Sequence, residues 1–209
     1  RREASARRHR DCMSDLTPTR SLLIALADER RTMREGYAFL DEKCLLLAGE
    51  MLRQVRLHQS LARQIVALNS AARHTLGSAL ARHGLQGLQV YPAGLSRQRL
   101  RIEPRPLLGV MTLSAQVVGE TATAPPAVNP SPEAEACRVT YARVAARLAE
   151  LAAVSATLMR LYSEYRRTVR RVRALQDVLL PELDADIADI DTRLEDIERE
   201  DAISMRFRR

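Results

Sequence analysis

Apolar residues recur at alternating steps of three and four along residues 18–83, and this spacing predicts one long helix. Only Arg30, Gln54 and His58 interrupt the series with a clearly polar residue. A seven-residue repeat held over so many turns is typical of a coiled coil rather than of a short amphipathic helix. We expect the helix to begin near Pro18, which would lie in its first turn, with Thr17 as the N-cap. The series runs through Leu23, Leu26, Arg30, Met33, Tyr37, Leu40, Cys44, Leu47, Met51, Gln54, His58, Leu61, Ile65, Leu68 and Ala72.

A second series with the same repeat predicts a second long helix over residues 133–209. Its step from Leu183 to Ile187 is four residues where the repeat requires three. Pro181 lies just before that step, and a proline inside a helix removes a backbone hydrogen bond. We therefore expect the helix to kink near Pro181 and the series to continue with a shifted phase. The series comprises Tyr141, Val144, Leu148, Leu151, Ser155, Leu158, Tyr162, Tyr165, Val169, Val172, Gln176, Leu179, Leu183, Ile187, Ile190, Leu194 and Ile197.

Residues 84–132 break both patterns, because they contain five of the eight glycines and seven of the nine prolines. Residues 88–91, 100–103 and 110–113 are candidates for short extended segments, interrupted by Pro92, Gly94, Pro104 and Pro106. Residues 121–132 contain four prolines and read as a linker. We expect a middle knob with a short β-hairpin, followed by this proline-rich linker.

Together these patterns predict an all-α fold. It is a long antiparallel two-helix coiled-coil hairpin with a small irregular or β-hairpin insertion at the turn end. At about 1.5 Å per residue each helix would be roughly 100 Å long, and helices of matched length pair most simply in an antiparallel hairpin. The composition agrees, because a narrow aliphatic seam needs few rings: aromatic residues make up 3%, tryptophan is absent, and charged residues make up 28%. Residues 1–17 form an Arg-rich leader without a periodic face, which we expect to be disordered.

Several classes of site are excluded by the residues present. Lys43 is the only lysine and follows no glycine, so the sequence holds no phosphate-binding P-loop. Cys12, Cys44 and Cys137 are too far apart for a zinc cluster, and the four histidines show no metal-ligand spacing. We therefore expect no catalytic residues, no metal site and no bound cofactor. No apolar run approaches the ~18 residues needed to cross a bilayer.

Charge is distributed unevenly along the chain, whose formal net charge is +7. Residues 1–173 carry a net +13, residues 174–201 a net −9, and residues 202–209 a net +3. In an antiparallel hairpin the acidic residues 182–201 would lie opposite Arg30, Arg31, Arg34 and Lys43. We expect these two ends to attract each other.

Positive charge also gathers in the middle of the second series, in a set that we call the arginine belt. We expect the belt to face Arg53, Arg56 and Arg63 and, lacking an internal acidic partner, to contact a partner protein. A solvated arginine-rich face is the alternative. Nucleic-acid binding is disfavoured, because only Tyr162 and Tyr165 could stack on bases, and we expect both in the core. The belt comprises Arg160, Arg166, Arg167, Arg170, Arg171 and Arg173.

Three stretches resemble the D subunit of V-type and A-type rotary ATPases, the central rotor stalk. Pro18-Thr19-Arg20, before the first helix, is similar to the family's N-terminal signature. Residues 170–181 resemble its most recognisable motif, including the proline inside the helix. Residues 190–201, followed by residues 207–209, resemble its acidic-then-basic tail. The family-motif residues carried over are Pro18, Thr19, Arg20, Ala174, Leu175, Pro181 and Arg199.

The resemblance implies a rotor-shaft subunit without catalytic residues of its own. Such a subunit couples ATP hydrolysis or synthesis in a catalytic head to translocation of an ion, expected to be a proton, by a membrane ring. The implied partners are a catalytic hexamer of A-like and B-like subunits, a small F-like stalk subunit, and a funnel-like adaptor on the rotor ring, reached by residues 84–119. The implied location is cytoplasmic and peripheral to the membrane, with no direct membrane insertion and no nucleic-acid partner. Two alternatives are a cytosolic coiled-coil scaffold or export-apparatus stalk without an ATPase head, and an Arg-rich nucleic-acid-binding helical protein.

Overall fold

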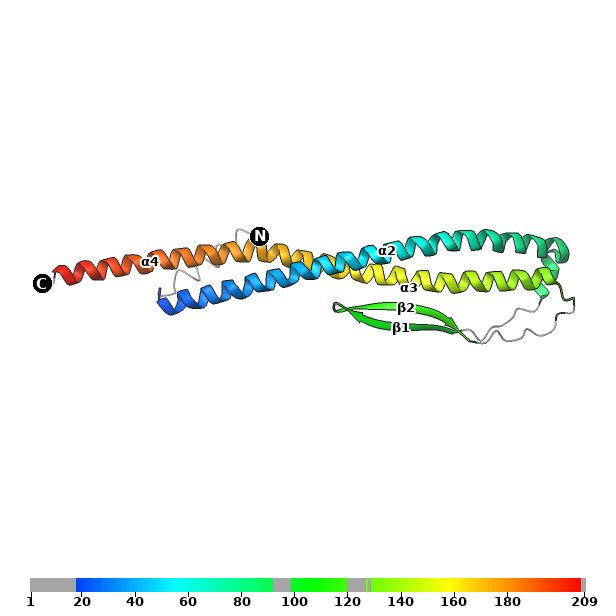
Figure 1. The fold of residues 1–209 in the computed structure, drawn as a ribbon, viewed down its shortest axis with the longest axis horizontal. Helices are drawn as coiled ribbons and strands as arrows, with labels where there is room; N and C mark the ends of the chain where they lie inside the picture. Colours follow the sequence, from blue (N-terminus) through cyan, green and yellow to red (C-terminus); the bar gives the residue numbers. More distant parts are fainter. Residues whose placement is uncertain (1–17, 92–98, 120–126, 128, 208–209) are drawn as a thin grey trace. The chain divides into compact units, whose positions relative to one another are not determined.

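The computed structural model describes residues 18–91, 99–119, 127 and 129–207. Its elements, in chain order, are helix α2 (Arg20–Val90), strands β1 (Arg99–Leu107) and β2 (Val110–Val118), helix α3 (Pro132–Ala174), the π-helix η1 (Leu175–Leu179) and helix α4 (Leu180–Phe207) (Figure 1). Two long helical regions with a small antiparallel sheet between them confirm the predicted fold class. The expected leader, the expected N-cap Thr17 and most of the expected linker lie outside the described residues.

The chain forms two compact units. Within the described residues, the first unit comprises residues 18–42 and 168–207, and the second comprises residues 43–167. In the first unit, Arg20 pairs with Glu198 and Arg30 pairs with Asp184, so α2 begins opposite the distal part of α4 and runs antiparallel to it. Ile190 is the buried residue of α4.

The phase shift expected near Pro181 is present as the π-helix η1, which directly precedes α4. The Leu180 N–H donates to the Leu175 carbonyl, five residues earlier rather than four. A π-turn holds one residue more than an α-turn, which matches the extra residue in the step from Leu183 to Ile187. The wider turn also relieves the clash that the Pro181 ring makes with a carbonyl one α-turn earlier.

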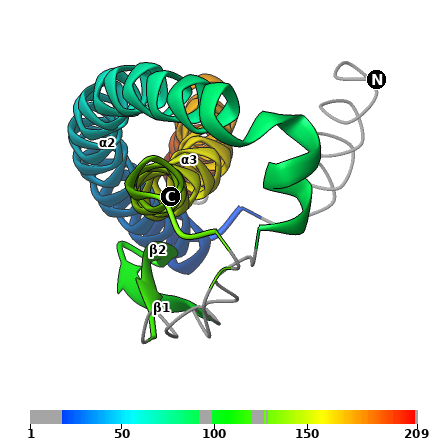
Figure 2. The ribbon, with the colours of Figure 1, turned by 90° about the vertical axis from the view of Figure 1, so that its right-hand side faces the viewer.

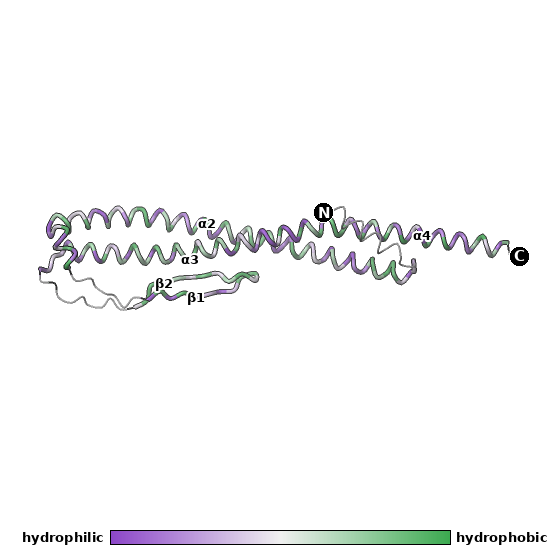
Figure 3. Tube along the Cα trace, turned by 180° about the vertical axis from the view of Figure 1, so that it is seen from behind, coloured by the Kyte–Doolittle hydropathy of each residue, from purple (hydrophilic) through white to green (hydrophobic). Residues whose placement is uncertain are grey.

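In the second unit, the predicted seam of α2 is confirmed. Every member of the series from Cys44 to Ala72 is buried or half-buried, and Leu47 is fully buried. Figure 3 shows apolar and polar positions interspersed along the helix. α2 continues past the predicted end at His83 to Val90, after a kink at Gly84 where φ is 65°. Glycine adopts this backbone conformation readily, so the helix changes direction there.

The buried face of α3 differs from the predicted series. Thr157 and Leu161 are fully buried, whereas Tyr162, expected in the core, is 52% exposed. The expectation for Tyr162 is therefore wrong, while Tyr165 is half-buried and packs against the core as expected. The reason is that α3 contacts the β-hairpin as well as α2, so its buried face is turned toward both.

β1 and β2 form a two-stranded antiparallel hairpin with a two-residue turn. Leu108 (φ 52°) and Gly109 (φ 81°) both have positive φ, as in a type I′ turn. Pro104 and Pro106, expected to interrupt extended structure, lie inside β1. Bonded and non-bonded pairs alternate outward from the turn, so both prolines occupy positions whose N–H would point away from β2. The pairing with β2 therefore loses no hydrogen bond to them.

The hairpin folds back along the helices from the point where it is inserted. Val110 packs with Leu47 and Leu161 in the core of the second unit. Along α2, Leu47 and the kink at Gly84 are roughly 55 Å apart at about 1.5 Å per residue. The tip of the hairpin thus lies far from the turn end of the helices, a placement that the sequence did not indicate.

Strand β2 turns its outer edge toward α3, and Figure 2 shows the two strands to one side of that helix. The Leu113 N–H donates to Thr157 Oγ1 at 2.9 Å, and the Thr157 hydroxyl lies 3.3 Å from the Leu113 carbonyl. Arg160 Nη1 donates to the Met111 carbonyl at 2.9 Å. Side chains of α3 therefore satisfy backbone groups that an edge strand would otherwise expose.

The extended structure expected over residues 88–91 is wrong. Residues 88–90 form the last turn of α2, and Tyr91 follows in a bend. The Tyr91 ring meets His83 with centroids 5.6 Å apart, and its hydroxyl accepts the Ser131 N–H at 3.4 Å. The helical turn after Gly84 brings the ring back to these two residues, which an extended segment would not do.

Candidate functional site

Pro18, Thr19 and Arg20 of the first motif lie at the start of α2. The Thr19 hydroxyl accepts the Leu22 N–H at 3.3 Å, and the Thr19 carbonyl accepts the Leu23 N–H at 3.1 Å. Thr19 is therefore the N-cap, and Pro18 precedes the cap. The expectation that Pro18 lies in the first helical turn is wrong, because the hydroxyl that caps the helix comes after it.

Ion pairs join the start of α2 to the acidic α4 within the first unit. Arg20 is hydrogen-bonded to Glu198, and this bond raises the pKa of the Arg20 guanidinium. Asp184 lies 3.1 Å from Arg30 and 3.7 Å from Arg34. The expected attraction between these two ends is confirmed for Arg30 and Arg34. It is wrong for two other cations: Arg31 pairs with Asp28 of its own helix, and Lys43 pairs with Glu164 of α3.

The remaining motif residues flank the π-helix and the end of α4. Ala174 is the last residue of α3, Leu175 begins η1, and Pro181 follows its end by two residues. Arg199 lies on the exposed surface of α4, where it pairs with Glu195 at 2.7 Å and Asp196 at 3.0 Å. Among the motif residues, Thr19 thus caps α2 and Leu175 begins the π-turn, while Arg199 neutralises neighbouring carboxylates on α4.

All six residues of the arginine belt lie on α3 and are exposed. Arg160 binds the hairpin backbone, and the Arg166 guanidinium stacks over the Tyr162 ring at 5.7 Å. For Arg167, Arg171 and Arg173, the described part of the chain offers no ion-pair partner. The role of the belt as a contact zone stays a prediction.

The expectation that the belt faces Arg53, Arg56 and Arg63 is wrong. Arg53 lines a groove together with Glu150 and Val154, and Lys43 meets Glu164. Position 53 therefore lies opposite residues near 150, not opposite residues 160–173. The expected register assumed that two helices of equal length have their ends aligned. The actual register of α2 against α3 is set by packing and ion pairs between the helices.

A junction at the tip of the hairpin joins three elements of the second unit. Lys43 Nζ donates to Glu164 Oε1 at 2.8 Å, and the two side chains are only 21% and 23% exposed. A Cβ atom at Gly109 would lie 4.0 Å from Lys43 Nζ, which places the ammonium beside the turn. Next to it, Leu108 packs against the buried core. This junction was not predicted from the sequence, although the single lysine of an arginine-rich chain and the Leu-Gly turn were signals for it.

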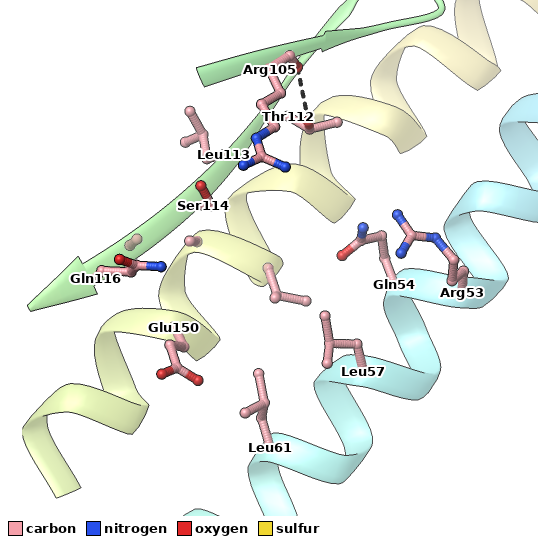
Figure 4. A pocket seen from close by; sticks show the side chains of 13 residues that line it. Arg53, Gln54, Leu57, Leu61, Arg105, Thr112, Leu113, Ser114, Gln116 and Glu150 are labelled. Carbon is pink, nitrogen blue, oxygen red and sulfur yellow. Dashed lines mark hydrogen bonds between the residues drawn. The ribbon is translucent and has the colours of Figure 1, made fainter. Parts of the chain in front are cut away.

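A groove of about 360 Å³ lies between α2, α3 and the hairpin (Figure 4). Leu57 and Leu61 of α2 line it from one side, and Arg105 and Gln116 reach it from the strands. Glu150, on α3, pairs with Arg147 of its own helix at 2.8 Å. The groove therefore combines an apolar floor with a few polar groups from the hairpin.

At the turn end of the second unit, α2 and α3 are joined by polar contacts. His83 Nε2 lies 2.6 Å from Ser131 Oγ, which also accepts the Ala134 N–H at 3.2 Å and so caps α3. Arg82 pairs with Glu133 at 2.9 Å. A hydrogen bond from its own backbone, together with those from Arg82, holds the pKa of Glu133 below its usual value.

Two further features bear on the chemistry of the chain. Among the described residues, no group of three or more His, Cys, Asp or Glu side chains could hold a metal ion. Within the same residues, no helix is both long and apolar enough to cross a membrane.

Comparison with known proteins places the chain in a family. Residues 22–207 match the family model that describes the D subunit of ATP synthase. The chain is 30% identical over 205 residues to the D subunit of the V-type ATP synthase of Thermus thermophilus, an alignment that covers 93% of this chain and 87% of that protein. It is 25% identical over 201 residues to the D subunit of the A-type ATP synthase of Methanopyrus kandleri, covering 94% and 86%. It is also 38% identical over 69 residues to the D subunit of the V-type proton ATPase of Arabidopsis thaliana, covering 33% and 26%. Because the family model spans nearly all of α2 to α4, the chain belongs to the D-subunit family of V-type and A-type ATP synthases.

Proposed function

We propose that this chain is the central-stalk subunit, or rotor shaft, of a V/A-type rotary ATPase. In this role it couples ATP hydrolysis or synthesis in the catalytic head to ion translocation by the membrane ring. The match to the D-subunit family over residues 22–207 is the observation that carries the proposal.

The geometry of each unit supports a part that transmits torque. In both units α2 is tied to the opposing helix by ion pairs whose partners are distant in sequence, and such cross-links resist sliding of one helix along the other. The first unit has Arg20–Glu198 and Arg30–Asp184. The second unit has Lys43–Glu164 and Arg82–Glu133.

The partners follow from the same proposal. The chain stands within a catalytic hexamer of A-like and B-like subunits, binds a small F-like stalk subunit, and meets a funnel-like adaptor on the rotor ring. It contributes no catalytic residue itself. A proton is the proposed ion, because the Arabidopsis thaliana relative is named as a subunit of a proton ATPase.

Coupling in native membranes tests the proposal. Inverted vesicles are prepared from cells that lack the chain and from the same cells complemented with it, and ATP hydrolysis and ATP-driven proton uptake are measured together. We expect hydrolysis without proton uptake, or loss of both, in the absence of the chain, and recovery on complementation. Unchanged coupling without the chain contradicts the proposal. Purification of the chain with non-ATPase proteins alone favours the scaffold alternative.

The arginine belt gives a sharper variant of this test. Arg167→Glu with Arg171→Glu reverses two exposed charges on α3 that have no ion-pair partner within the described residues. We expect the double variant to lose assembly with the other ATPase subunits while the isolated chain keeps its melting temperature. Arg73→Glu with Arg143→Glu, two exposed arginines of α2 and α3 outside the belt, changes the net charge equally and serves as the control. An equal loss of melting temperature and assembly would argue for a structural role of the belt.

A further inference from the structure

Strand β1 has one paired edge and one free edge. Its inner edge pairs with β2, and β2 meets α3 through the bond between Leu113 and Thr157. Figures 1 and 2 accordingly show β1 farther from α3 than β2 is. Residues 99–106 are all exposed except the half-buried Glu103. The outer edge of β1 is therefore an edge strand open to solvent.

The register of the hairpin decides which backbone groups of β1 point outward. Leu107 pairs with Val110 next to the two-residue turn, so every second residue from there bonds to β2 and the residues between point away from it. Strand β2 follows the same rule, because the Leu113 N–H points away from β1 and reaches Thr157 on α3. The outward-pointing residues of β1 are Leu100, Ile102, Pro104 and Pro106.

Prolines divide this free edge into two halves. Pro104 and Pro106 have no N–H, so the half next to the turn cannot donate hydrogen bonds to an added strand. Leu100 and Ile102 keep both an N–H and a carbonyl, and among the described residues no hydrogen bond occupies these outward groups. Proline is one of the devices that keep an edge strand unpaired, and here it protects only one half. Residues 99–103 are thus the part of the edge that can accept another strand.

Side chains of this open half alternate between apolar and charged. Leu100 and Ile102 are 55% and 52% exposed, although both are large and apolar. The residues between them belong to the opposite face of the strand, where Arg101 pairs with Glu103 at 3.0 Å. Arg99 lies on that face too and has no ion-pair partner within the described residues. One face of the open half is therefore apolar, and the other carries net positive charge.

We propose that residues 99–103 bind an extended segment of a partner protein, which adds a third strand to the hairpin. The segment bonds to the outward backbone groups of Leu100 and Ile102. Its apolar side chains cover those two residues, and they alternate with acidic side chains that meet Arg99 and Arg101. A second copy of this chain is disfavoured, because β1 carries three arginines and one glutamate, so two copies would repel each other. The proposal concerns the edge itself and does not rest on the proposed function.

Hydrogen exchange in the intact complex tests strand addition. The tagged full chain is purified from its own cells with its bound proteins, and exchange at single amides is read by mass spectrometry with electron-transfer dissociation. The isolated chain is the reference. We expect the Leu100 and Ile102 amides to exchange at least about tenfold more slowly in the complex. The Arg101 and Glu103 amides, which bond to β2, should be protected in both samples. Equal rates at Leu100 and Ile102 in the two samples would overturn the proposal.

A proline substitution distinguishes an added strand from simple burial of the edge. Ile102→Pro removes the outward N–H and leaves the bonds to β2 in place, as Pro104 and Pro106 already do. Ile102→Val keeps the N–H and is the matched control. We expect the complex of the proline variant to lose protection at the Leu100 amide and that of the valine variant to keep it. The Leu113 amide, bound to α3, should stay equally slow in both. Slow exchange at Leu100 in both variants would contradict strand addition.

Photo-crosslinking identifies the partner segment. The full chain carries p-benzoylphenylalanine at position 100 or, as a matched control, at position 118. Val118 is also apolar and is 44% exposed, but it lies on β2, one strand away from the free edge. We expect position 100 to capture one peptide of another protein, with alternating apolar and acidic residues, and position 118 to give at least about tenfold less of it. Capture of a second copy of this chain, of a peptide without that alternation, or of nothing at position 100 would each overturn the proposal.

A charge variant tests the acidic face of the segment. Arg99→Glu with Arg101→Glu should lower the yield of the position-100 product by roughly tenfold, because the acidic residues of the segment then meet like charge. Arg73→Glu with Arg143→Glu, two exposed arginines of α2 and α3, changes the net charge equally and should leave the yield unchanged. An equal yield in the two double variants would contradict an acidic partner.

The same preparations separate this proposal from the proposed function. If ATPase subunits are absent but position 100 captures an alternating segment, strand addition stands and the rotor assignment fails. If the chain restores ATP-driven proton uptake but exchange at Leu100 and Ile102 does not slow in the complex, the rotor assignment stands and strand addition fails.

Discussion

Lys43 Nζ donates a hydrogen bond of 2.8 Å to Glu164 Oε1, and this pair joins α2 to α3 beside the tip of the hairpin. Most of each side chain is buried, so solvent screens this pair less than it screens the exposed ion pairs of the chain. The fully buried Leu47 lies one helical turn further along α2. The pair therefore stabilises the register of α2 against α3 where the β-turn meets the two helices.

Lys43→Met removes the ammonium that faces the half-buried Glu164 carboxylate. We expect the free energy of unfolding to fall by about 1–3 kcal/mol, because a charged hydrogen bond is lost and the carboxylate stays shielded from water. Urea denaturation followed by circular dichroism measures the change. Arg31→Met on the same helix is the control, since the Arg31 side chain is 73% exposed and its partner Asp28 is 63% exposed, and it should cost less than about 1 kcal/mol. Equal losses in the two variants would mean that the Lys43 pair has no special role.

Thr157→Val keeps the shape of the side chain and removes the hydroxyl that binds the edge of β2. The Leu113 N–H loses its acceptor, so we expect a loss of about 1–3 kcal/mol and faster hydrogen exchange at the Leu113 amide. Thr192→Val is the matched control, because the Thr192 hydroxyl bonds only to the Ala188 carbonyl on the exposed surface of its own helix. Exchange at Leu113 that does not change would show that the hairpin does not depend on this contact.

Gly109→Ala places a Cβ in the type I′ turn, where φ is 81°. We expect a loss of about 1 kcal/mol or more, since L-residues other than Asn and Asp rarely adopt positive φ. Gly36→Ala gives the opposite sign: Gly36 lies inside α2 with no atom near the added Cβ, and alanine should stabilise the helix by about 0.5–1 kcal/mol. Thermal or urea unfolding of the two variants in parallel checks both signs, and a shift in the same direction would contradict the assigned turn.

Pro181→Ala tests whether the π-helix already accommodates the proline. In a regular helix interior a proline costs about 3 kcal/mol, but η1 precedes Pro181 and its wider turn removes the clash with the earlier carbonyl. We therefore expect alanine to raise stability by less than about 1 kcal/mol, with η1 retained because the step from Leu183 to Ile187 still requires an extra residue. Urea denaturation measures the stability, and a crystal structure of the variant shows whether Leu180 still bonds to Leu175. A gain near 3 kcal/mol, or conversion of η1 to an α-turn, would show that the proline rather than the seam creates the π-turn.

Much of the candidate site could be located from the sequence, but its internal contacts could not. Periodicity placed the arginine belt on a helix, and the resemblance to the D subunit pointed to the motif residues; α3 and α4 carry most of these residues. The attraction of Arg30 for the acidic segment also followed from charge position, because antiparallel pairing brings the two chain ends together. The partner of Lys43 and the neighbours of Arg53 depend on the register of α2 against α3. This register could not be predicted from the equal lengths of the two helices.

From the sequence alone follow the long helices, the seam of α2 that includes Leu47, the break in the helical backbone at Gly84 and the shift of phase near Pro181. These are local properties, because the heptad repeat, a glycine's positive φ and a proline's missing N–H act within one or two turns. The buried face of α3, by contrast, follows from contacts with the hairpin, which cover Thr157 and leave Tyr162 exposed. Which face of α3 is buried depends on where the hairpin folds back against it. That contact joins residues distant in sequence, such as Leu113 and Thr157, which are 44 positions apart. Periodicity within a single helix cannot encode such a contact.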